Sequence, residues 1–298
     1  MKNILIIGCG LLGSSLLRRI KEKKIAKNIY IFEKSKKNIL KIKRLNLSVR
    51  IVKSLKEGVI NTDLIIFCTP MSEYKKIILK INKFIPPNCL ITDIGSSKVV
   101  TSKIIQKFLK KKISWVSSHP IAGSEVSGPE HGKSNMFVNR WCILIKEKNT
   151  KKNDLKILDK FWKKIGSKTV VMSSEKHDKI FSMTSHLPHL IAYNLVKSAQ
   201  EFEKKQNYNL IKFSAGGLRD FSRIAASNEV MWRDIFFNNK NNVSKAINLF
   251  IKSLNEFKKD INLKDNKSIL KKLTQTKKVR SKIIKLKQDV NKPDFGRN

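Results

Sequence analysis

Residues 2–13 of the chain read KNILIIGCGLLG, and this stretch decides the fold class. Its apolar first half predicts a short buried strand over Lys2–Ile7, and the residues after the last glycine, Ser14–Ile20, predict a helix. A glycine turn between a strand and a helix brings backbone N–H groups close to the pyrophosphate of a dinucleotide. We therefore expect a dinucleotide-binding unit at the start of the chain. A glycine turn that serves only packing is the alternative.

The three glycines of this unit have different expected roles. Gly8 allows the tight turn, Gly10 lets the backbone approach a pyrophosphate, and Gly13 lets the helix pack closely against the strand. Further cofactor contacts are expected from the start of the helix and from the loop that closes the fourth strand. The predicted cofactor-binding residues are Gly8, Gly10, Leu11, Leu12, Gly13, Glu33, Thr69 and Pro70.

An acidic residue at the end of the second expected strand bears on the choice of cofactor. That strand, Asn28–Phe32, is followed by Glu33, which lies twenty residues after Gly13. A carboxylate there accepts hydrogen bonds from both ribose hydroxyls and repels a 2′-phosphate, so NAD is favoured over NADP. Lys34 and Ser35 keep NADP open as the less favoured cofactor, because they offer contacts to a phosphate if Glu33 turns away.

Strand-like and helix-sized segments alternate through the first half of the chain. This alternation calls for right-handed crossovers and a mostly parallel sheet, so the predicted fold class is a Rossmann-type, doubly wound α/β domain over residues 1–173. The further strands are expected at Ser48–Val52, Asp63–Cys68, Cys89–Ile94, Arg140–Ile145 and Lys168–Met172, with a helix at Asn153–Ile165 between the last two.

From residue 174 onward the pattern becomes helical, which predicts an all-α domain over residues 174–298. By analogy with other folds that place a helical domain beside a dinucleotide domain, we expect it to supply part of the substrate site and a homodimer interface. Amphipathic helices are expected at Asn242–Phe257 and Ser268–Leu286, and a frayed end at Asn291–Asn298. Pro188 is expected to kink or break the first helix and to turn His186 and His189 toward a cleft. The apolar residues at helical spacing in that helix are Ile180, Met183, Leu187, Leu190, Ile191 and Leu195.

The net charge of +40 is the strongest signal in the composition. Of the 63 basic residues ten are arginines and the others lysines, which are spread along the whole chain. Such a surface attracts anionic small molecules, and an AT-rich coding sequence produces the same composition, so no nucleic-acid partner is expected. The isolated cysteines favour a reducing compartment, the cytoplasm. Because no run of about 18 apolar residues occurs, no membrane partner is expected.

A histidine lies in the segment 117–128, which reads SSHPIAGSEVSG. It follows the strand-like run Ile113–Val116, so His119 is expected on a constrained loop at the carboxyl edge of the sheet, where open α/β folds bind ligands. Pro120 restricts the backbone after it and Gly123 permits a sharp turn. A neutral imidazole there is a candidate proton acceptor. The alternative is a histidine that only packs or caps the loop.

Several separated motifs in order resemble the prephenate/arogenate (cyclohexadienyl) dehydrogenase family of tyrosine biosynthesis. The resemblance runs from Gly8 to about Phe236. It rests on the glycine turn and on the segments DIGSSK (93–98), SHPIAGSE (118–125), His177-Asp178, SHLPH (185–189) and GLRDFSRIA (217–225). It implies an NAD-dependent oxidoreductase with a Rossmann domain and a helical dimerisation domain. The implied reaction is the oxidative decarboxylation of prephenate to 4-hydroxyphenylpyruvate, of arogenate to tyrosine, or of both.

The resemblance also implies site residues. His119 would accept the proton of the ring hydroxyl, and Ser96 would hold that hydroxyl or orient His119. From the helical domain, His189 and Arg223 would line the substrate site, with Arg223 as the carboxylate clamp. A small anionic substrate fits the chemistry of arginine, whose planar guanidinium binds a carboxylate in two-pronged fashion.

The remaining polar candidates are weaker. Glu125 is expected as a gate or ion-pair partner or as a solvated acid, and Ser185 as a supporting substrate contact or a helix-start residue. Asp178 is expected to orient or cap rather than react, and His131 and His177 are not expected to be catalytic. Arg219 and Arg233 are expected to form structural ion pairs. No histidine–carboxylate spacing predicts a metal site.

Two other readings of the sequence stay open. A related NAD(P)-dependent β-hydroxyacid dehydrogenase would rely on a catalytic lysine in the helical domain and would not need the motifs around His119 and Arg223. A basic nucleic-acid-binding protein on a Rossmann scaffold would bind DNA with strong salt dependence and would not bind NAD. The sequence also leaves the choice between prephenate and arogenate open.

Overall fold

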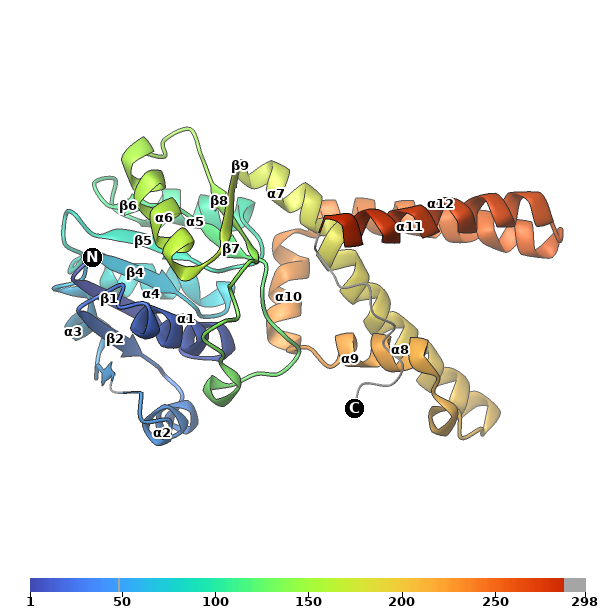
Figure 1. The fold of residues 1–298 in the computed structure, drawn as a ribbon, viewed down its shortest axis with the longest axis horizontal. Coiled ribbons are helices and arrows are strands. Elements are labelled where there is room, and N and C mark those ends of the chain that lie inside the picture. The colour runs from blue at the N-terminus through green and yellow to red at the C-terminus, as the bar shows by residue number, and fades with distance from the viewer. Residues whose placement is uncertain (48, 287–298) are drawn as a thin grey trace.

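The computed structural model describes residues 1–47 and 49–286, and it has an α/β body from which long helices extend (Figure 1). The body holds a parallel sheet of six strands in the order β3-β2-β1-β4-β5-β6. This order confirms the predicted Rossmann-type fold, with the switch point between β1 and β4. The strands are β1 Asn3–Ile7, β2 Asn28–Phe32, β3 Arg50–Ile51, β4 Leu64–Phe67, β5 Leu90–Asp93 and β6 Ser114–Trp115.

Helices cover both faces of this sheet because alternate residues of each strand point to opposite sides. Along β1, Ile4 and Ile6 pack against helices α1 and α6, whereas Leu5 and Ile7 pack against α4 and α5. All four isoleucine and leucine side chains are fully buried. The helices of the body are α1 Leu11–Glu22, α2 Lys36–Arg44, α3 Leu55–Val59, α4 Tyr74–Ile81, α5 Val99–Phe108 and α6 Lys152–Ile165.

A second sheet of three strands carries His119, and this corrects two expectations. Its strands are β7 Ser118–Pro120, β8 Trp141–Ile145 and β9 Lys168–Met172, with β7 antiparallel to β8 and β8 parallel to β9. His119 therefore pairs with Ile143 inside a strand and does not lie on a loop. The two later strands do not extend the parallel sheet. Short apolar runs predict strands well, but they carry no information about which sheet a strand joins.

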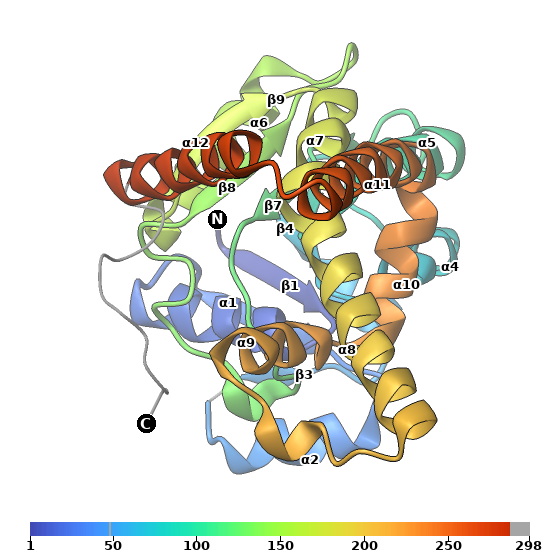
Figure 2. The same ribbon diagram turned by 90° about the vertical axis from the view of Figure 1, so that its right-hand side faces the viewer.

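The helical part begins with α7 Ser174–Phe181 and a π-helical turn, Ser182–His186, which leads directly into α8 Leu187–Gln206. Pro188 lies in the first turn of α8, directly after the π-helical turn, and the helical run continues through it without a break. The π-helical turn takes up the irregularity that the proline was expected to cause. Helix α9, Gly216–Ala225, then lies alongside α8 (Figure 2).

The last helices are α10 Glu229–Asn238, α11 Lys240–Asn262 and α12 Asn266–Lys285. Helices α11 and α12 pack against each other and extend away from the α/β body (Figure 1). Both are longer at their N-terminal ends than the periodicity predicted. The predicted frayed end, Asn291–Asn298, lies outside the described residues.

Many large apolar side chains of the helical part are exposed. From the apolar residues at helical spacing, Ile180, Met183 and Leu195 are 37%, 44% and 41% exposed. The α11–α12 pair adds further exposed residues, namely Leu249, Ile251, Leu254, Ile261, Leu270, Leu273 and Val279. None of the helices in the described part of the chain is both long and apolar enough to cross a membrane.

Candidate active site

The glycine turn between β1 and α1 has the shape of a nucleotide cradle. Gly8 has φ +89°, and a Cβ added to it would lie 2.9 Å from the carbonyl oxygen of Cys68. A Cβ on Gly13 would lie 2.2 Å from the carbonyl oxygen of Gly8, so both positions require glycine for packing. A Cβ on Gly10 would meet nothing within 4 Å. Gly10 therefore borders open space at the N-terminus of α1, where no side chain caps the helix.

Glu33 lies beside this turn, as its position after β2 predicts. Its Oε2 accepts a hydrogen bond from the Cys9 N–H at 2.8 Å, and its Oε1 accepts one from the Ser35 N–H at 2.9 Å. The carboxylate is thus fixed at the edge of the turn that Gly10 leaves open. Leu11 and Leu12 begin α1 directly behind it.

Thr69 and Pro70 follow β4 and reach the same turn from the neighbouring strand. The Cγ2 of Thr69 would lie 2.8 Å from a Cβ on Gly8. Its Oγ1 is buried and has no hydrogen-bond partner among the described residues. A buried hydroxyl at a nucleotide cradle is a group that a ligand can satisfy. The turn, Glu33 and Thr69 together fit a dinucleotide.

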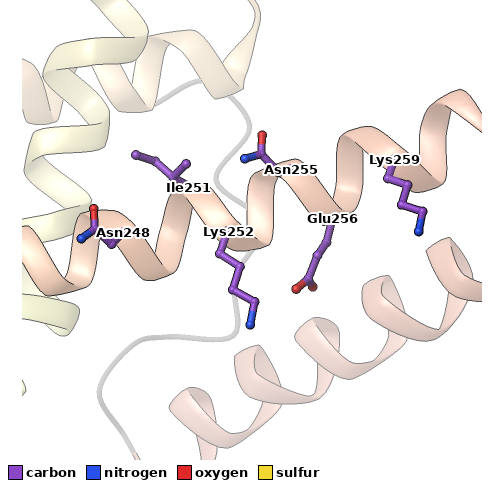
Figure 3. Close-up of a pocket in the computed structure, with 6 residues that line it drawn as sticks. All are labelled: Asn248, Ile251, Lys252, Asn255, Glu256 and Lys259. Carbon is purple, nitrogen blue, oxygen red and sulfur yellow. The ribbon is translucent and has the colours of Figure 1, made fainter.

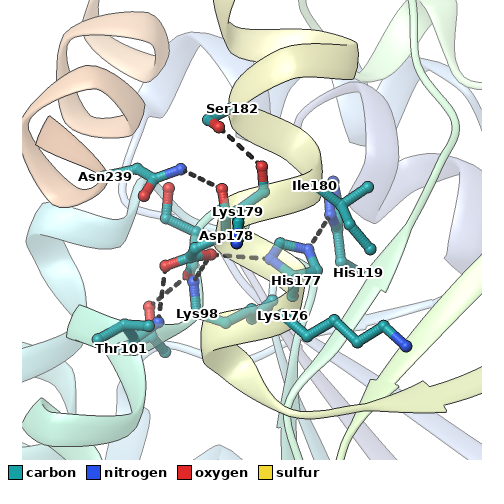
Figure 4. A network of polar contacts seen from close by, with 12 residues as sticks. Lys98, Thr101, His119, Lys176, His177, Asp178, Lys179, Ile180, Ser182 and Asn239 are labelled. Carbon is teal, nitrogen blue, oxygen red and sulfur yellow. Dashed lines mark hydrogen bonds and ion pairs between the residues drawn. The ribbon is translucent and has the colours of Figure 1, made fainter. Parts of the chain in front are cut away.

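His119 lies in β7, the edge strand of the second sheet, and its side chain is almost completely buried. It is 8% exposed, and its ring centroid lies 5.0 Å from that of Phe181. Nδ1 lies 2.8 Å from Nε2 of His177, while the described residues provide no hydrogen-bond partner for Nε2 (Figure 4). Burial lowers the pKa of His119 well below 6.5, and the neighbouring His177, Lys98 and His186 act in the same direction. The imidazole is therefore neutral.

The contact to His177 continues to Asp178. Nδ1 of His177 lies 2.8 Å from Oδ1 of Asp178. The same carboxylate accepts hydrogen bonds from the backbone N–H groups of Lys98 at 2.8 Å and Val99 at 2.9 Å, at the start of α5. Burial lowers the pKa of His177 to about 2, with Lys98 and His186 acting in the same direction. Asp178 orients and caps, as expected, whereas the direct contact of His177 with His119 was missed.

A buried ion pair between Lys98 and Asp93 contacts the backbone of β7. Nζ of Lys98 lies 2.7 Å from Oδ2 of Asp93 and donates to the carbonyl oxygen of Ser118 at 2.7 Å. Both charged side chains are fully buried. The Tyr74 hydroxyl donates to the same carboxylate at 3.2 Å. The motif DIGSSK contains both charged residues, but their spacing along the chain does not reveal that they form an ion pair next to β7.

Ser96 is partly buried in the loop after β5. Because His177 binds Nδ1 of His119, that nitrogen needs no orienting contact from Ser96. Its other expected role, to hold the substrate hydroxyl, stays a prediction. The next residue, Ser97, has a buried Oγ without a hydrogen-bond partner in the described part of the chain.

The helical part contributes two predicted substrate residues through α8 and the π-helical turn before it. His189 Nδ1 donates to the carbonyl oxygen of Ser185 at 2.9 Å, which leaves Nε2 as the acceptor nitrogen. Its ring stacks on Trp232 with the centroids 3.8 Å apart. Burial lowers the pKa of His189. His186, in contrast, is fully buried, and Asn239 Nδ2 lies 3.1 Å from its Nδ1, so His186 does not face a cleft.

Arg223 on α9 reaches back to the loop that follows His119. Its Nη1 lies 3.5 Å from Oε2 of Glu125, and its Nη2 lies 3.9 Å from Oδ1 of Asp220. Its Nε is buried and has no hydrogen-bond partner among the described residues. Glu125 is thus an ion-pair partner, one of the roles expected for it. By contrast, Arg233 pairs with Asp234 at 2.7 Å and so has the expected structural role.

A shallow hollow on α11 is not part of the predicted site. It is lined by Asn248, Ile251, Lys252, Asn255, Glu256 and Lys259 (Figure 3). Its lysines and amides come from one helix and none of them contacts His119 or the glycine turn. Within residues 1–47 and 49–286, no group of three or more histidine, cysteine or acidic side chains is arranged to hold a metal ion.

Comparison with known proteins shows which family the chain resembles. Residues 16–171 match the family model described as prephenate dehydrogenase, nucleotide-binding domain, and residues 173–275 match prephenate dehydrogenase, dimerization domain. The chain is 32% identical over 279 residues to a cyclohexadienyl dehydrogenase of Zymomonas mobilis, covering 94% of this chain and 95% of that protein. It is 30% identical to a prephenate dehydrogenase of Bacillus subtilis, covering 90% of this chain and 72% of that protein.

The fold agrees with these matches. The structure superposes on prephenate dehydrogenase from A. aeolicus, which was solved in complex with hydroxyphenyl propionate and NAD+, with a TM-score of 0.88 and 32% sequence identity. The superposition covers 95% of this chain and 98% of that chain. Both family models, these relatives and this structure agree, and the chain therefore belongs to the prephenate dehydrogenase family of oxidoreductases.

Proposed function

We propose that this enzyme oxidises and decarboxylates prephenate or arogenate with NAD as the hydride acceptor. The products would be 4-hydroxyphenylpyruvate from prephenate or tyrosine from arogenate, together with carbon dioxide. The observation that carries the proposal is His119, a buried and neutral imidazole held through Nδ1, with Nε2 left without a partner among the described residues. A substrate hydroxyl can donate to that nitrogen.

His119 moves one proton in this scheme. Its Nε2 accepts the proton of the ring hydroxyl while the carbon that bears the hydroxyl loses hydride and becomes a carbonyl. NAD, when bound, supplies the hydride acceptor. The bond between the ring and its carboxylate then breaks, and its electron pair enters the ring as carbon dioxide leaves. His119 returns the proton to the phenolate oxygen, so the aromatic product carries a hydroxyl.

The helical part supplies the anion contacts in this proposal. Arg223 offers its buried Nε and its two Nη groups to a substrate carboxylate. Glu125 neutralises the guanidinium when no substrate is bound, and a carboxylate must compete with it. His189 offers its Nε2 toward the substrate, and Ser185 holds the His189 ring through its carbonyl oxygen. Ser96 completes the proposed contacts by holding the ring hydroxyl.

NAD is preferred in this proposal because of Glu33. Its carboxylate sits on the Cys9 and Ser35 N–H groups at the edge of the glycine turn, where it would repel a 2′-phosphate. Bound ribose hydroxyls would donate to the same carboxylate. The residues that would hold the cofactor are those predicted: Gly8, Gly10, Leu11, Leu12, Gly13, Glu33, Thr69 and Pro70.

The proposal includes a homodimer formed through the helical part. Large apolar side chains are exposed along α8, α11 and α12, and a contiguous apolar surface commonly marks a protein–protein interface. We also propose the cytoplasm as the compartment. All four cysteines are free, and Cys9, Cys89 and Cys142 are buried, which suits a reducing environment.

The first test is the absorbance of NADH formed by purified protein with prephenate and with arogenate, each with NAD and with NADP. We expect reduction with NAD and with at least one substrate. The His119→Asn variant should lower kcat by about 10²- to 10⁴-fold, the usual effect of losing a general base, while the Kd for NAD stays unchanged. Binding of NAD without reduction by either substrate would contradict the proposal and favour a β-hydroxyacid dehydrogenase.

A further inference from the structure

Three side chains form a continuous hydrogen-bonded series from α7 into the active site. Asp178 Oδ1 lies 2.8 Å from His177 Nδ1, and His177 Nε2 lies 2.8 Å from His119 Nδ1 (Figure 4). His177 and Asp178 are fully buried, so water does not compete for these contacts. Each ring nitrogen along the series must therefore act either as donor or as acceptor toward its neighbour.

The carboxylate end fixes the direction of the series. Both oxygens of Asp178 already face donors, because Oδ1 accepts from the Lys98 N–H and Oδ2 accepts from the Val99 N–H. A carboxylate in this position accepts from His177, so Nδ1 of His177 carries the proton. In a neutral ring, Nε2 of His177 is then an acceptor. Nε2 of His177 therefore accepts a hydrogen bond from the Nδ1–H of His119. Nε2 of His119 then carries no proton and keeps its lone pair.

The surroundings hold the rings in this arrangement. The centroid of Phe181 lies 4.5 Å from that of His177 and 5.0 Å from that of His119. Asn239 Nδ2 donates to the backbone carbonyl of Asp178 at 2.7 Å, which anchors α7 from the side of α11. Lys98 and His186 lie nearby as cationic or potentially cationic groups, and they disfavour protonation of both rings. The series therefore holds one neutral tautomer of each histidine.

We infer that His177, anchored by Asp178, is a positioning residue that holds His119 in the tautomer with its lone pair on Nε2. This inference rests on the proposed function, in which Nε2 of His119 accepts the proton of the substrate hydroxyl. The opposite tautomer places a proton on Nε2 and cannot accept one. The free histidine side chain favours that opposite tautomer, so the active one has to be selected by the protein.

The variant His177→Phe removes the acceptor and keeps an aromatic ring next to Phe181. We expect kcat to fall by about 10- to 100-fold, the usual effect of losing an orienting contact, with the KM and the Kd for NAD nearly unchanged. The matched variant His177→Gln places an amide oxygen near the position of the lost Nε2. It should recover part of kcat, which a purely structural role would not explain. His177→Leu serves the same purpose as the phenylalanine variant if the latter does not fold.

The tautomer itself is measurable without substrate. The chain has five histidines, so the ¹⁵N chemical shifts of the ring nitrogens in histidine-labelled full-length protein can be assigned by substitution. In the wild type we expect His119 to be protonated at Nδ1 and unprotonated at Nε2. In His177→Phe we expect the proton to move to Nε2.

The two measurements separate this inference from the proposed function. An unchanged tautomer in both His177→Phe and His177→Leu overturns the inference, whatever happens to kcat. A kcat that stays within about twofold of the wild type also overturns it. If the tautomer changes as expected while the wild type reduces NAD with neither substrate, the positioning role stands and the proposed reaction is wrong.

Discussion

His119 is the residue on which the chemistry depends, and its surroundings change the pH behaviour expected from a histidine. An exposed histidine with a pKa of about 6.5 is half protonated at about pH 6.5. Burial, with the nearby His177, Lys98 and His186, lowers the pKa of His119 well below that value. Since only the neutral ring accepts a proton, activity is lost when the pH falls through the lowered pKa and not before.

We therefore expect kcat/KM to stay level from neutral pH down through about pH 6.5 and to fall only at clearly lower pH. A base with the ordinary histidine pKa would instead lose half of its activity at about pH 6.5. The measurement is a kcat/KM profile between about pH 5 and about pH 9, with circular dichroism at each pH to show that the protein stays folded. Half-maximal activity near pH 6.5 in folded protein would show that His119 titrates normally or is not the base.

The residues that the sequence reveals and those that it hides differ in a physical way. Gly8, Gly13 and Glu33 act within one strand–turn–helix unit, so their spacing along the chain already contains the geometry. His177 is separated from His119 by 58 residues, and only the packing of α7 against β7 brings them together. The pairing of Lys98 with Asp93 was missed for a related reason, because two charges five residues apart are more often solvated.

At the scale of elements, the turn between β1 and α1 allows a matched pair of substitutions. Gly10→Ala adds a methyl group that meets nothing within 4 Å, so it should lower the melting temperature only by the small cost of alanine at a helix N-cap. Gly13→Ala places a methyl group 2.2 Å from the Gly8 carbonyl oxygen and should destabilise the fold by about 1–3 kcal/mol. Both should weaken NAD binding at least about tenfold, Gly10→Ala because backbone approach to the pyrophosphate is blocked.

Thermal unfolding and titration with NAD measure the two effects separately. If Gly10→Ala bound NAD as tightly as the wild type, the space beside Gly10 would not be the pyrophosphate site. The alternative reading of the sequence, a glycine turn used only for packing, would then be the better one.

The strands show which part of the sheet topology the hydrophobic pattern of the sequence can predict. The six strands of the parallel sheet follow from the alternation of apolar runs and helix-sized segments. The three-stranded sheet does not, because β8 has the same apolar character as the buried parallel strands. Its partner β7 is only three residues long and includes a proline. Few sequence rules would assign a strand there.

For the whole molecule, the exposed apolar surface of the helical part predicts the state of association. Leu254 on α11 is 55% exposed. We expect the wild type to be a dimer at micromolar concentration and Leu254→Glu to shift it toward monomer, because a buried unpaired charge is costly at an apolar interface. Ser253→Glu adds the same charge at the adjoining exposed polar position and is the control. Light scattering after size-exclusion chromatography gives the masses.

A monomeric wild type would show that the helical part forms no dimer. A Leu254→Glu variant with the mass of the wild-type dimer would place the dimer interface away from Leu254.

The sequence could not predict how far the α11–α12 pair extends from the body. Amphipathic periodicity shows that a helix has an apolar face, and it does not show whether the same chain covers that face. Nor did the net charge of +40 help to place any element.

The series from Asp178 to His119 has a consequence for how genes of this kind can recombine. β9 ends at Met172 and α7 begins at Ser174, so a crossover between them cuts no helix or strand. The module that encodes His119 would then receive His177 and Asp178 from another parent, together with the contacts of Asp178 to Lys98 and Val99. Chimeras joined after Phe181 keep all of these residues from one parent, and they are the ones in which the histidine pair is inherited intact.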